Sequence, residues 1–335
     1  MAPSSRHHDA IEPMLAKSVD RFPPGSAGQW CYEPKLDGFR ALASVDADRG
    51  VRLRSRNGAR FNETFPEVVG ALFEHVPART VLDGEIVRWS ASGRLDFGAL
   101  HRRQVAGHRR AAALVPSEPC HYAVFDLLRL RGQDVTGLPL SERRALLETV
   151  FAAIPDAGVL ALGMQTRLES EARVWYETMR HAGVEGLVIK PARSRYECGK
   201  RAWLKLKHRT STDAVVGGCV GPPGRPTELI LGRHDQTGRL RVVARTTRLS
   251  ARAAAEIASL LTPASGEHPW PAPLPPGWAG GPYGRPGPLP YVQVRPELVV
   301  EVLADTAMEG HRHRHAVTYL RPRAELHPMQ LDPIE

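Results

Sequence analysis

Four short charged motifs follow one another along the chain, and they contain residue types that could carry out phosphate chemistry. They lie at residues 33–38 (Glu-Pro-Lys-Leu-Asp-Gly), 83–85 (Asp-Gly-Glu), 185–190 (Glu-Gly-Leu-Val-Ile-Lys) and 203–207 (Trp-Leu-Lys-Leu-Lys). A lysine amine can attack phosphorus, carboxylates can hold a hard divalent cation, and further cations can neutralise phosphate oxygens. Any one motif alone is common, whereas the ordered set contains all three kinds of group.

Lys35 is the candidate nucleophile. An unperturbed lysine has a pKa near ~10.4, so its amine is reactive only where burial or neighbouring cations disfavour the ammonium. We expect a divalent metal together with Lys190, Lys205 and Lys207 to create that field. The structural alternative is a surface lysine in a turn.

The other charged residues lie in or beside runs that predict β-strands. Lys205 and Lys207 alternate with leucines, so a strand would present both ammonium groups on one face and both leucines on the other. Glu85 and Glu185 end or begin strand-like runs, where a rigid backbone can direct them into one cleft. The alternative is a pair of surface carboxylates on edge strands.

The elements that must position these residues follow from local patterns. Alternating or apolar runs predict strands, and an apolar stripe with a capping residue predicts a helix. In the first two thirds of the chain we expect strands at 51–56, 81–87, 122–128 and 186–190, a two-residue hairpin turn at Asn57-Gly58, a helix that Ser141 caps and whose stripe reaches Ile154, and a helix from Ser170 to a glycine stop at Gly183.

Residues 210–213 predict a polar link, after which strands begin again. Several strands and one helix in the remaining stretch are typical of a small barrel of the OB type. Nine prolines and five glycines between Pro269 and Pro290 predict a loop or a partly disordered insertion. The expected elements are strands at 214–216, 229–232, 240–244, 294–302 and 316–320, and a short capped helix from Ser250 to Leu261.

The ordered motifs resemble those of the nucleotidyltransferase superfamily of ATP-dependent DNA ligases and mRNA capping enzymes. The chain is most similar to compact bacterial ATP-dependent DNA ligases, the C type and the ligase module of the D type, over about residues 13–328. The resemblance implies an α+β fold: an ATP-grasp-like nucleotidyltransferase domain with antiparallel sheets and flanking helices, followed by an all-β OB-fold barrel. The implied divisions are a flexible N-terminus at 1–10, an adenylyltransferase domain at 11–209, and an OB-fold domain at 210–335 with a Pro/Gly-rich insertion at about 263–290.

The resemblance also implies roles for single residues. Lys35 would attack the α-phosphate of ATP, forming phosphoramide-linked AMP and releasing pyrophosphate. Glu85 would serve the ribose or a metal ion, Mg²⁺ or Mn²⁺, and Glu185 would hold the metal. Phe125 would stack on adenine, with a buried core phenylalanine as the alternative, and Glu33 would line the adenine site.

Cationic residues are assigned to phosphate and sugar by the same resemblance, with solvated side chains as the alternative. Lys205 and Lys207 would meet the α-phosphate, Arg40 and Arg56 would hold the ribose or the nick phosphate, and the remaining members of the ATP-binding set are Lys190 and Arg201.

Two further basic segments could contact nucleic acid. In the family, an arginine-rich motif on the barrel meets pyrophosphate, and here the chain departs from the commoner Arg-x-Asp-Lys form because Ala324 follows Arg323. The segment from His101 to Arg110 could contact the DNA backbone, or be an exposed loop. A histidine metal site at His311, His313 and His315 is the other reading of the C-terminal run, whose arginines are Arg312, Arg314, Arg321 and Arg323.

Composition narrows the class of protein. A net charge of +9 with a pI near 9.7 suits a polyanionic partner, although an arginine-rich proteome would also produce it. No apolar stretch approaches the ~20 residues that cross a bilayer, so we expect no membrane partner. The four cysteines lack Cys-x-x-Cys spacing, which argues against zinc and against the NAD-dependent ligases. We therefore expect a cytoplasmic, nucleoid-associated protein.

The function that we predict is sealing of nicks with 5′-phosphate and 3′-hydroxyl ends by an ATP-dependent DNA ligase, through a covalent lysyl-AMP intermediate, in DNA repair. The expected partners are nicked or short-gapped duplex DNA and a primase-polymerase or end-binding repair protein, and the expected state is a monomer. Two alternatives stay open: an RNA ligase or capping-type guanylyltransferase, and a non-catalytic nucleic-acid-binding module.

Overall fold

The computed structural model describes residues 11–154, 158–278 and 287–334. Its contacts divide the chain into two units, Met1–Lys207 and His208–Glu335. No helix in the described ranges is long and apolar enough to cross a membrane. The flexible tip expected at residues 1–10 lies outside the described residues.

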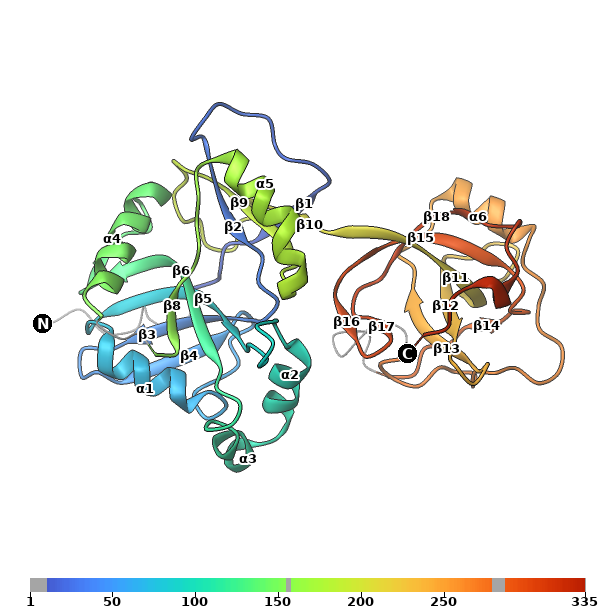
Figure 1. Cartoon of the computed structure of the whole chain (residues 1–335), viewed down its shortest axis with the longest axis horizontal. Coiled ribbons are helices and arrows are strands. Elements are labelled where there is room, and N and C mark those ends of the chain that lie inside the picture. The colour runs from blue at the N-terminus through green and yellow to red at the C-terminus, as the bar shows by residue number, and fades with distance from the viewer. Residues whose placement is uncertain (1–10, 155–157, 279–286, 335) are drawn as a thin grey trace, which may run out of the picture. The chain divides into compact units, whose positions relative to one another are not determined.

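Unit 1 contains two β-sheets (Figure 1). Sheet A has the order β1-β10-β9-β2, with strands Ala16–Val19 (β1), Trp203–Lys207 (β10), Gly186–Pro191 (β9) and Trp30–Pro34 (β2). Sheet B has the order β4-β3-β5-β6-β7 with β8 beside β6, and its strands are Val51–Ser55 (β4), Phe39–Val45 (β3), Thr80–Val87 (β5), His121–Leu130 (β6), Gln133–Asp134 (β7) and Leu160–Leu162 (β8).

Helices cover one face of each sheet. Pro66–His75 (α1) and Leu140–Ala152 (α4) pack on sheet B, and Glu169–Thr178 (α5) packs on sheet A (Figure 1). One apolar cluster contains side chains of both sheets, including Trp203 from β10 and Leu128 from β6. The remaining helical elements of unit 1 are Phe97–Val105 (α2), His108–Ala113 (α3) and the 3₁₀ turn Met179–Ala182 (η1).

Unit 2 is a curled sheet in the order β13-β12-β11-β15-β18. Its two edges meet, because Val317 accepts a backbone hydrogen bond from Thr247 and donates one to Arg245. Closure of this kind removes exposed strand edges. The elements are Arg209–Val220 (β11), Glu228–His234 (β12), Leu240–Arg245 (β13), Ala251–Ala258 (α6), Val292–Gln293 (β14), Val299–Asp305 (β15), Met308–Glu309 (β16), Arg312–His313 (β17), Thr318–Pro322 (β18) and the 3₁₀ turn Pro328–Gln330 (η2).

The expected α+β unit followed by an all-β barrel is confirmed, and so are several local predictions. Ser250 caps α6 by accepting a hydrogen bond from the Ala253 N–H. After α5 and its 3₁₀ extension, Gly183 adopts a left-handed φ of 82°, which is the expected glycine stop.

Some local expectations were wrong. Ser141 does not cap α4, because the helix begins one residue earlier, at Leu140, without a side-chain cap. The turn after β4 is a three-residue loop: the Ser55 N–H donates to Ala59 O, and Gly58 has a φ of 83°. The polar link at 210–213 is instead part of β11, where these residues pair with β15. Cross-strand pairing therefore overrode the local polar pattern.

The proline- and glycine-rich segment contributes to the barrel core. Trp270 is 2% exposed, and its indole N–H donates to Leu240 O at 2.9 Å. A Cβ at Gly217 or Gly232 would lie within 2.6 Å of this indole, so the two glycines make room for it. The part of the segment at residues 263–278 is thus packed in place by an aromatic anchor, which proline content alone does not reveal. Residues 279–286 lie outside the described part of the chain.

Candidate active site

The backbone of Lys35 is fixed by the segment that enters β9. The Lys35 N–H donates to Gly186 O at 2.8 Å, and the Glu185 N–H donates to Lys35 O at 2.9 Å. Gly186 has a φ of 140°, and a Cβ there would lie 2.0 Å from Leu206 O, so the position requires glycine. The first and third motifs therefore meet through their main chains.

The strand register of sheet A gathers the charged residues on one face. Val188 in β9 lies between Glu33 of β2 and Lys205 of β10, and Lys207 is two residues further along the same face. The predicted alternation of lysines and leucines is confirmed, since the two leucines of β10 lie in the apolar cluster beneath α5. These leucines are Leu204 and Leu206.

The Lys35 side chain is surrounded by carboxylates. Its ammonium contacts Glu185, whose side chain is 5% exposed, and Lys207 Nζ lies 3.5 Å from the same carboxylate oxygen. Burial lowers the pKa of Lys35, but Glu185, Glu85 and Asp37 outweigh it and raise the pKa above its ordinary value. The field expected from a divalent metal together with the neighbouring lysines stays a prediction.

Two other groups near Lys35 have pKa values moved by their surroundings. Burial raises the pKa of Glu85 to about 8, although Lys35 and Arg40 oppose this shift. Burial, followed by the charges of Lys207 and Lys35, lowers the pKa of Lys205. Shifts in pKa that are produced by burial together with charged neighbours are typical of functional sites.

Lys190 pairs with a different carboxylate from the one that meets Lys35. It is fully buried, and its Nζ is 2.7 Å from Glu33 Oε2. The same ammonium lies 4.4 Å from the Phe125 ring centroid and 4.1 Å from that of Trp203. Register explains this placement, because Lys190 pairs with Cys31, on the far side of Glu33 from Lys35. Phe125 is half-buried, so it is neither a fully buried core residue nor freely exposed.

Arg40 belongs to a buried polar network that the sequence did not reveal. Its guanidinium forms two hydrogen bonds with Asp83, at 3.0 and 2.6 Å, and Asp83 is fully buried. Tyr196 donates its hydroxyl proton to Asp83 at 2.7 Å and accepts the Met14 N–H at 3.1 Å. Asp83 belonged to a recognised motif, whereas nothing in the local sequence marked Tyr196.

A second buried pair supports the strand that carries Phe125. Asp126 accepts hydrogen bonds from the Nε and one terminal nitrogen of Arg143, at 2.8 and 2.9 Å, and both side chains are fully buried. Arg143 also donates to Leu138 O and Ser194 O. A charge so placed is tolerated only when its hydrogen bonds are satisfied.

Arg56 and Arg201 take no part in these buried pairs. Both are exposed. The Arg56 N–H donates to Arg40 O at 3.2 Å, which places the turn after β4 beside Arg40. Arg201 precedes β10, and its guanidinium donates to Ala16 O at 3.4 Å.

The C-terminal arginines divide into two groups within unit 2. Arg321 and Arg323 on and after β18 pair with Glu301, Glu325 and Asp213. The other two lie on and after β17, and Arg312 stacks over the Trp278 ring at 5.2 Å. They are Arg312 and Arg314.

The basic segment at 101–110 is helical and partly structural. Arg103 is 1% exposed and makes two 2.8 Å hydrogen bonds to Glu67. It also donates to Thr64 O and Glu118 O. Neither of the two alternatives for this segment, contact with the DNA backbone or an exposed loop, fits Arg103, whose guanidinium is buried, while Arg102 and Arg109 are exposed.

Metal donors in the cleft are few. Within residues 11–154, 158–278 and 287–334, no group of three or more histidine, cysteine or carboxylate side chains is arranged to hold a metal ion, which also removes the histidine site near His313. Mg²⁺ needs only one or two carboxylates when water and substrate phosphates complete its shell. Glu85 and Glu185 both raise the pKa of the Lys35 amine, which places the two carboxyl groups beside the same ammonium. Together they provide the oxygen donors that Mg²⁺ needs.

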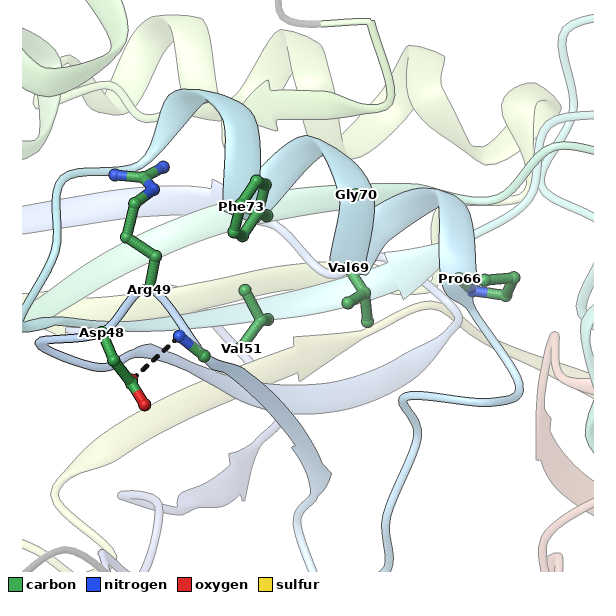
Figure 2. Close-up of a pocket in the computed structure, with 8 residues that line it drawn as sticks. Asp48, Arg49, Val51, Pro66, Val69, Gly70 and Phe73 are labelled. Atoms are coloured by element: carbon green, nitrogen blue, oxygen red, sulfur yellow. Dashed lines mark hydrogen bonds between the residues drawn. The ribbon is translucent and has the colours of Figure 1, made fainter.

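A surface pocket between the β3–β4 turn and α1 contains none of the predicted site residues. Figure 2 shows Val51, Val69 and Phe73 lining it, with the Arg49 side chain at its edge. Arg49 lies 5.1 Å from the Phe73 ring centroid. The lining of this pocket is largely apolar and lacks a cluster of ionisable groups. We therefore place the candidate site at Lys35.

Comparison with known proteins agrees with this geometry. A family model described as the ATP dependent DNA ligase domain matches residues 13–207. DNA ligase C of Mycobacterium tuberculosis is 36% identical over 340 residues, which cover 95% of this chain and 91% of that protein. The multifunctional non-homologous end joining DNA repair protein LigD of the same species is 32% identical over 324 residues, covering 94% of this chain and 39% of that protein.

The crystal structure of the ligase domain of M. tuberculosis LigD matches with a TM-score of 0.50 and 28% identity, over 97% of this chain and 99% of that chain. This match confirms the predicted nucleotidyltransferase fold with its OB-like half-barrel. The family model covers more than half of the chain, and DNA ligase C is 36% identical over nearly the whole length of both proteins. These two matches establish the family. The chain belongs to the ATP-dependent DNA ligases.

Proposed function

We propose that this ligase seals nicks with 5′-phosphate and 3′-hydroxyl ends through an AMP group carried on Lys35. The observation that carries the proposal is the fixed position of Lys35. Its main chain is bonded to Glu185 and Gly186, and its ammonium faces Glu185 on the face where Lys205 and Lys207 lie. A nucleophile needs this kind of positioning more than it needs acid–base partners.

In the first step, Lys35 Nζ forms a bond to the α-phosphorus of ATP while the bond to pyrophosphate breaks. The ammonium must first lose a proton, and Glu185 already accepts its hydrogen bond. Lys205 and Lys207 lie on this face of sheet A, and Lys207 Nζ lies 3.5 Å from the Glu185 carboxylate that meets Lys35, so we assign both lysines to the α-phosphate oxygens. A bound Mg²⁺ or Mn²⁺ would be held by Glu85 and Glu185, and it would supply charge neutralisation.

The base site is assigned to Phe125 and Glu33. Phe125 provides a flat ring, and Lys190 connects the ring to the Glu33 carboxylate. We assign Lys190 to this support role instead of phosphate binding, because its ammonium is enclosed. Arg40, with exposed Arg56 beside it, is the candidate for the ribose or the nick phosphate, and Arg201 remains a candidate for the triphosphate.

In the second and third steps, AMP passes to the 5′-phosphate, and the 3′-hydroxyl then displaces AMP as the strand is joined. Four of the exposed or half-buried arginines of unit 2 are candidate contacts for pyrophosphate or DNA. LigD is named for end joining, so we propose work on nicked or short-gapped DNA beside a primase-polymerase or end-binding protein. The proposed setting is a monomer in the cytoplasm, at the nucleoid. The arginines of unit 2 proposed as contacts for pyrophosphate or DNA are Arg312, Arg314, Arg321 and Arg323.

Labelled nucleotides test the proposal. Purified protein is incubated with Mg²⁺ and either α-³²P-ATP or α-³²P-GTP, denatured, and run on a gel beside Lys35→Ala and the surface control Lys17→Ala. We expect an AMP adduct in the wild type and in Lys17→Ala, and none in Lys35→Ala. A GMP adduct alone would favour a capping-type enzyme, and label retained by Lys35→Ala would exclude the assigned nucleophile.

A sealing assay then separates DNA from RNA substrates. Nicked duplexes with deoxyribonucleotides or ribonucleotides at the 3′ side are offered to the adenylylated protein. We expect joining of the DNA nick and loss of the adduct at the same rate. Joining confined to RNA would favour the RNA ligase alternative, and DNA binding without any adduct would favour the non-catalytic module.

A further inference from the structure

One segment crosses from sheet B to sheet A beside the base site. Gly163, after β8, donates its N–H to Val124 O at 2.7 Å, next to Phe125. Three residues later, Thr166 and Tyr32 exchange two backbone hydrogen bonds, at 2.8 and 3.0 Å, next to Glu33. Residues 163–166, here called the bridging segment, therefore connect the strand that carries the aromatic ring to the strand that carries the carboxylate.

Gln165 projects from the bridging segment onto Glu33. Gln165 Nε2 donates to Glu33 Oε1 at 2.7 Å, while Lys190 holds the other oxygen at 2.7 Å. A carboxylate flanked by an ammonium can only accept, so the amide must turn its NH₂ towards Glu33. Its carbonyl oxygen, Oε1, is then directed away from Glu33. Fixed hydrogen bonds thus set the orientation of an amide that would otherwise be free to flip.

The result is an edge made of acceptors beside a flat ring. Glu33 is 4% exposed and Gln165 is half-buried, so neither group can rotate freely into solvent. At position 6 of a purine, adenine carries an amine that donates, whereas guanine carries an oxygen that accepts. The 6-amine of adenine can donate to the acceptors of Glu33 and Gln165. The 6-oxygen of guanine would instead face these oxygens and leave the acceptors unpaired.

We propose that Gln165 is a specificity-determining residue that makes the ligase prefer ATP to 6-oxopurine nucleotides. It does so by orienting Glu33 and by presenting its own carbonyl oxygen to the 6-amino group. This inference rests on the proposed function, because it places the base between Phe125 and Glu33.

The experiment measures adduct formation from ATP, GTP and ITP as single-turnover kcat/KM. ITP carries the 6-oxygen without the 2-amine of guanine, so the ATP:ITP ratio reports on positions 1 and 6 of the purine without a contribution from position 2. Gln165→Met removes the amide at nearly constant length, Gln165→Asn keeps the amide but shortens it, and Gln133→Met on the exposed β7 is the matched control. We expect the ATP:ITP ratio to fall at least tenfold in Gln165→Met, less in Gln165→Asn, and not in Gln133→Met.

A merely structural role for Gln165 would lower the rates for all three nucleotides together. An unchanged ATP:ITP ratio in both Gln165 variants, with a normal AMP adduct in the wild type, would overturn this inference and leave the proposed function standing. Absence of an AMP adduct in the wild type would overturn both. If Gln165→Met failed to fold, a ratio lowered in Gln165→Asn would still support the inference, and an unchanged ratio would overturn it.

Discussion

The ion pairs of unit 1 and those of unit 2 use the same residue types in different surroundings. In unit 1, the carboxylates that pair with Arg40, Arg143 and Lys190 have side chains no more than 6% exposed. In unit 2, Arg321 is 53% exposed, and its partner Glu301 is 19% exposed. Water competes for the second kind of pair and not for the first.

This difference separates the cations that are held in buried ion pairs from those that stay accessible to a ligand. A buried pair contributes little net stability as a whole, but loss of one partner leaves an uncompensated charge inside the protein. An exposed pair can exchange its carboxylate for a phosphate at small cost. Arginines of unit 2 are therefore available to a polyanion, whereas Arg143 and Arg103 hold the fold.

The largest effect is expected for Arg143→Met. It removes two hydrogen bonds from Asp126 and leaves that carboxylate buried without a cation. We expect a loss of about 3–5 kcal/mol in the free energy of unfolding, measured by urea denaturation. The double variant Arg143→Met/Asp126→Leu should recover part of the loss. A loss below about 1 kcal/mol would remove the contrast between the units.

Glu85 provides a pH-dependent test. Burial raises its pKa from the ordinary 4.5 to about 8, so its contribution to stability is complete below pH 4.5 and is lost as pH rises through about 8. Wild type should therefore lose stability across this window relative to Glu85→Gln, by roughly 4 kcal/mol near pH 8. Urea unfolding with EDTA present measures the difference, and parallel pH profiles for the two proteins would contradict it.

Glu185→Gln should separate chemistry from stability. The change keeps the shape of the side chain but removes the charge that meets Lys35 and Lys207. We expect AMP-adduct formation to slow by about 100-fold, equivalent to about 2.7 kcal/mol. Glu74→Gln on the exposed side of α1 is the matched control and should keep its rate. Equal rates in the two variants would mean that Glu185 has no place in the first step.

The smallest effect is expected for Arg321→Met. Because this pair is exposed, its loss should change the free energy of unfolding by less than about 1 kcal/mol. DNA affinity should nevertheless fall, and fall less as salt increases, if the side chain meets a phosphate. Fluorescence anisotropy with nicked duplex at two salt concentrations measures this. An unfolding change as large as that of Arg143→Met would contradict the comparison.

Sequence patterns predicted best where a residue's neighbours along the chain decide its position. The glycine stop at Gly183, the cap at Ser250 and the alternation in β10 are local, so the patterns were sufficient. The prediction failed where a distant strand decided, as at residues 210–213, which pair with β15. A buried indole likewise placed the proline-rich segment, although nothing in that segment's composition showed that Trp270 has a site in the barrel.

For the candidate site, residue types and their order were sufficient to identify the family and to predict the nucleophile and its carboxylates. Tertiary structure alone decided which cation meets which carboxylate: Lys190 pairs with Glu33, and Lys35 meets Glu185. It also revealed Tyr196, Arg143 and Gln165 as neighbours of the site. The physical reason is that a charge's effect depends on burial and on partners brought together by strand register. Spacing along a chain does not encode either quantity.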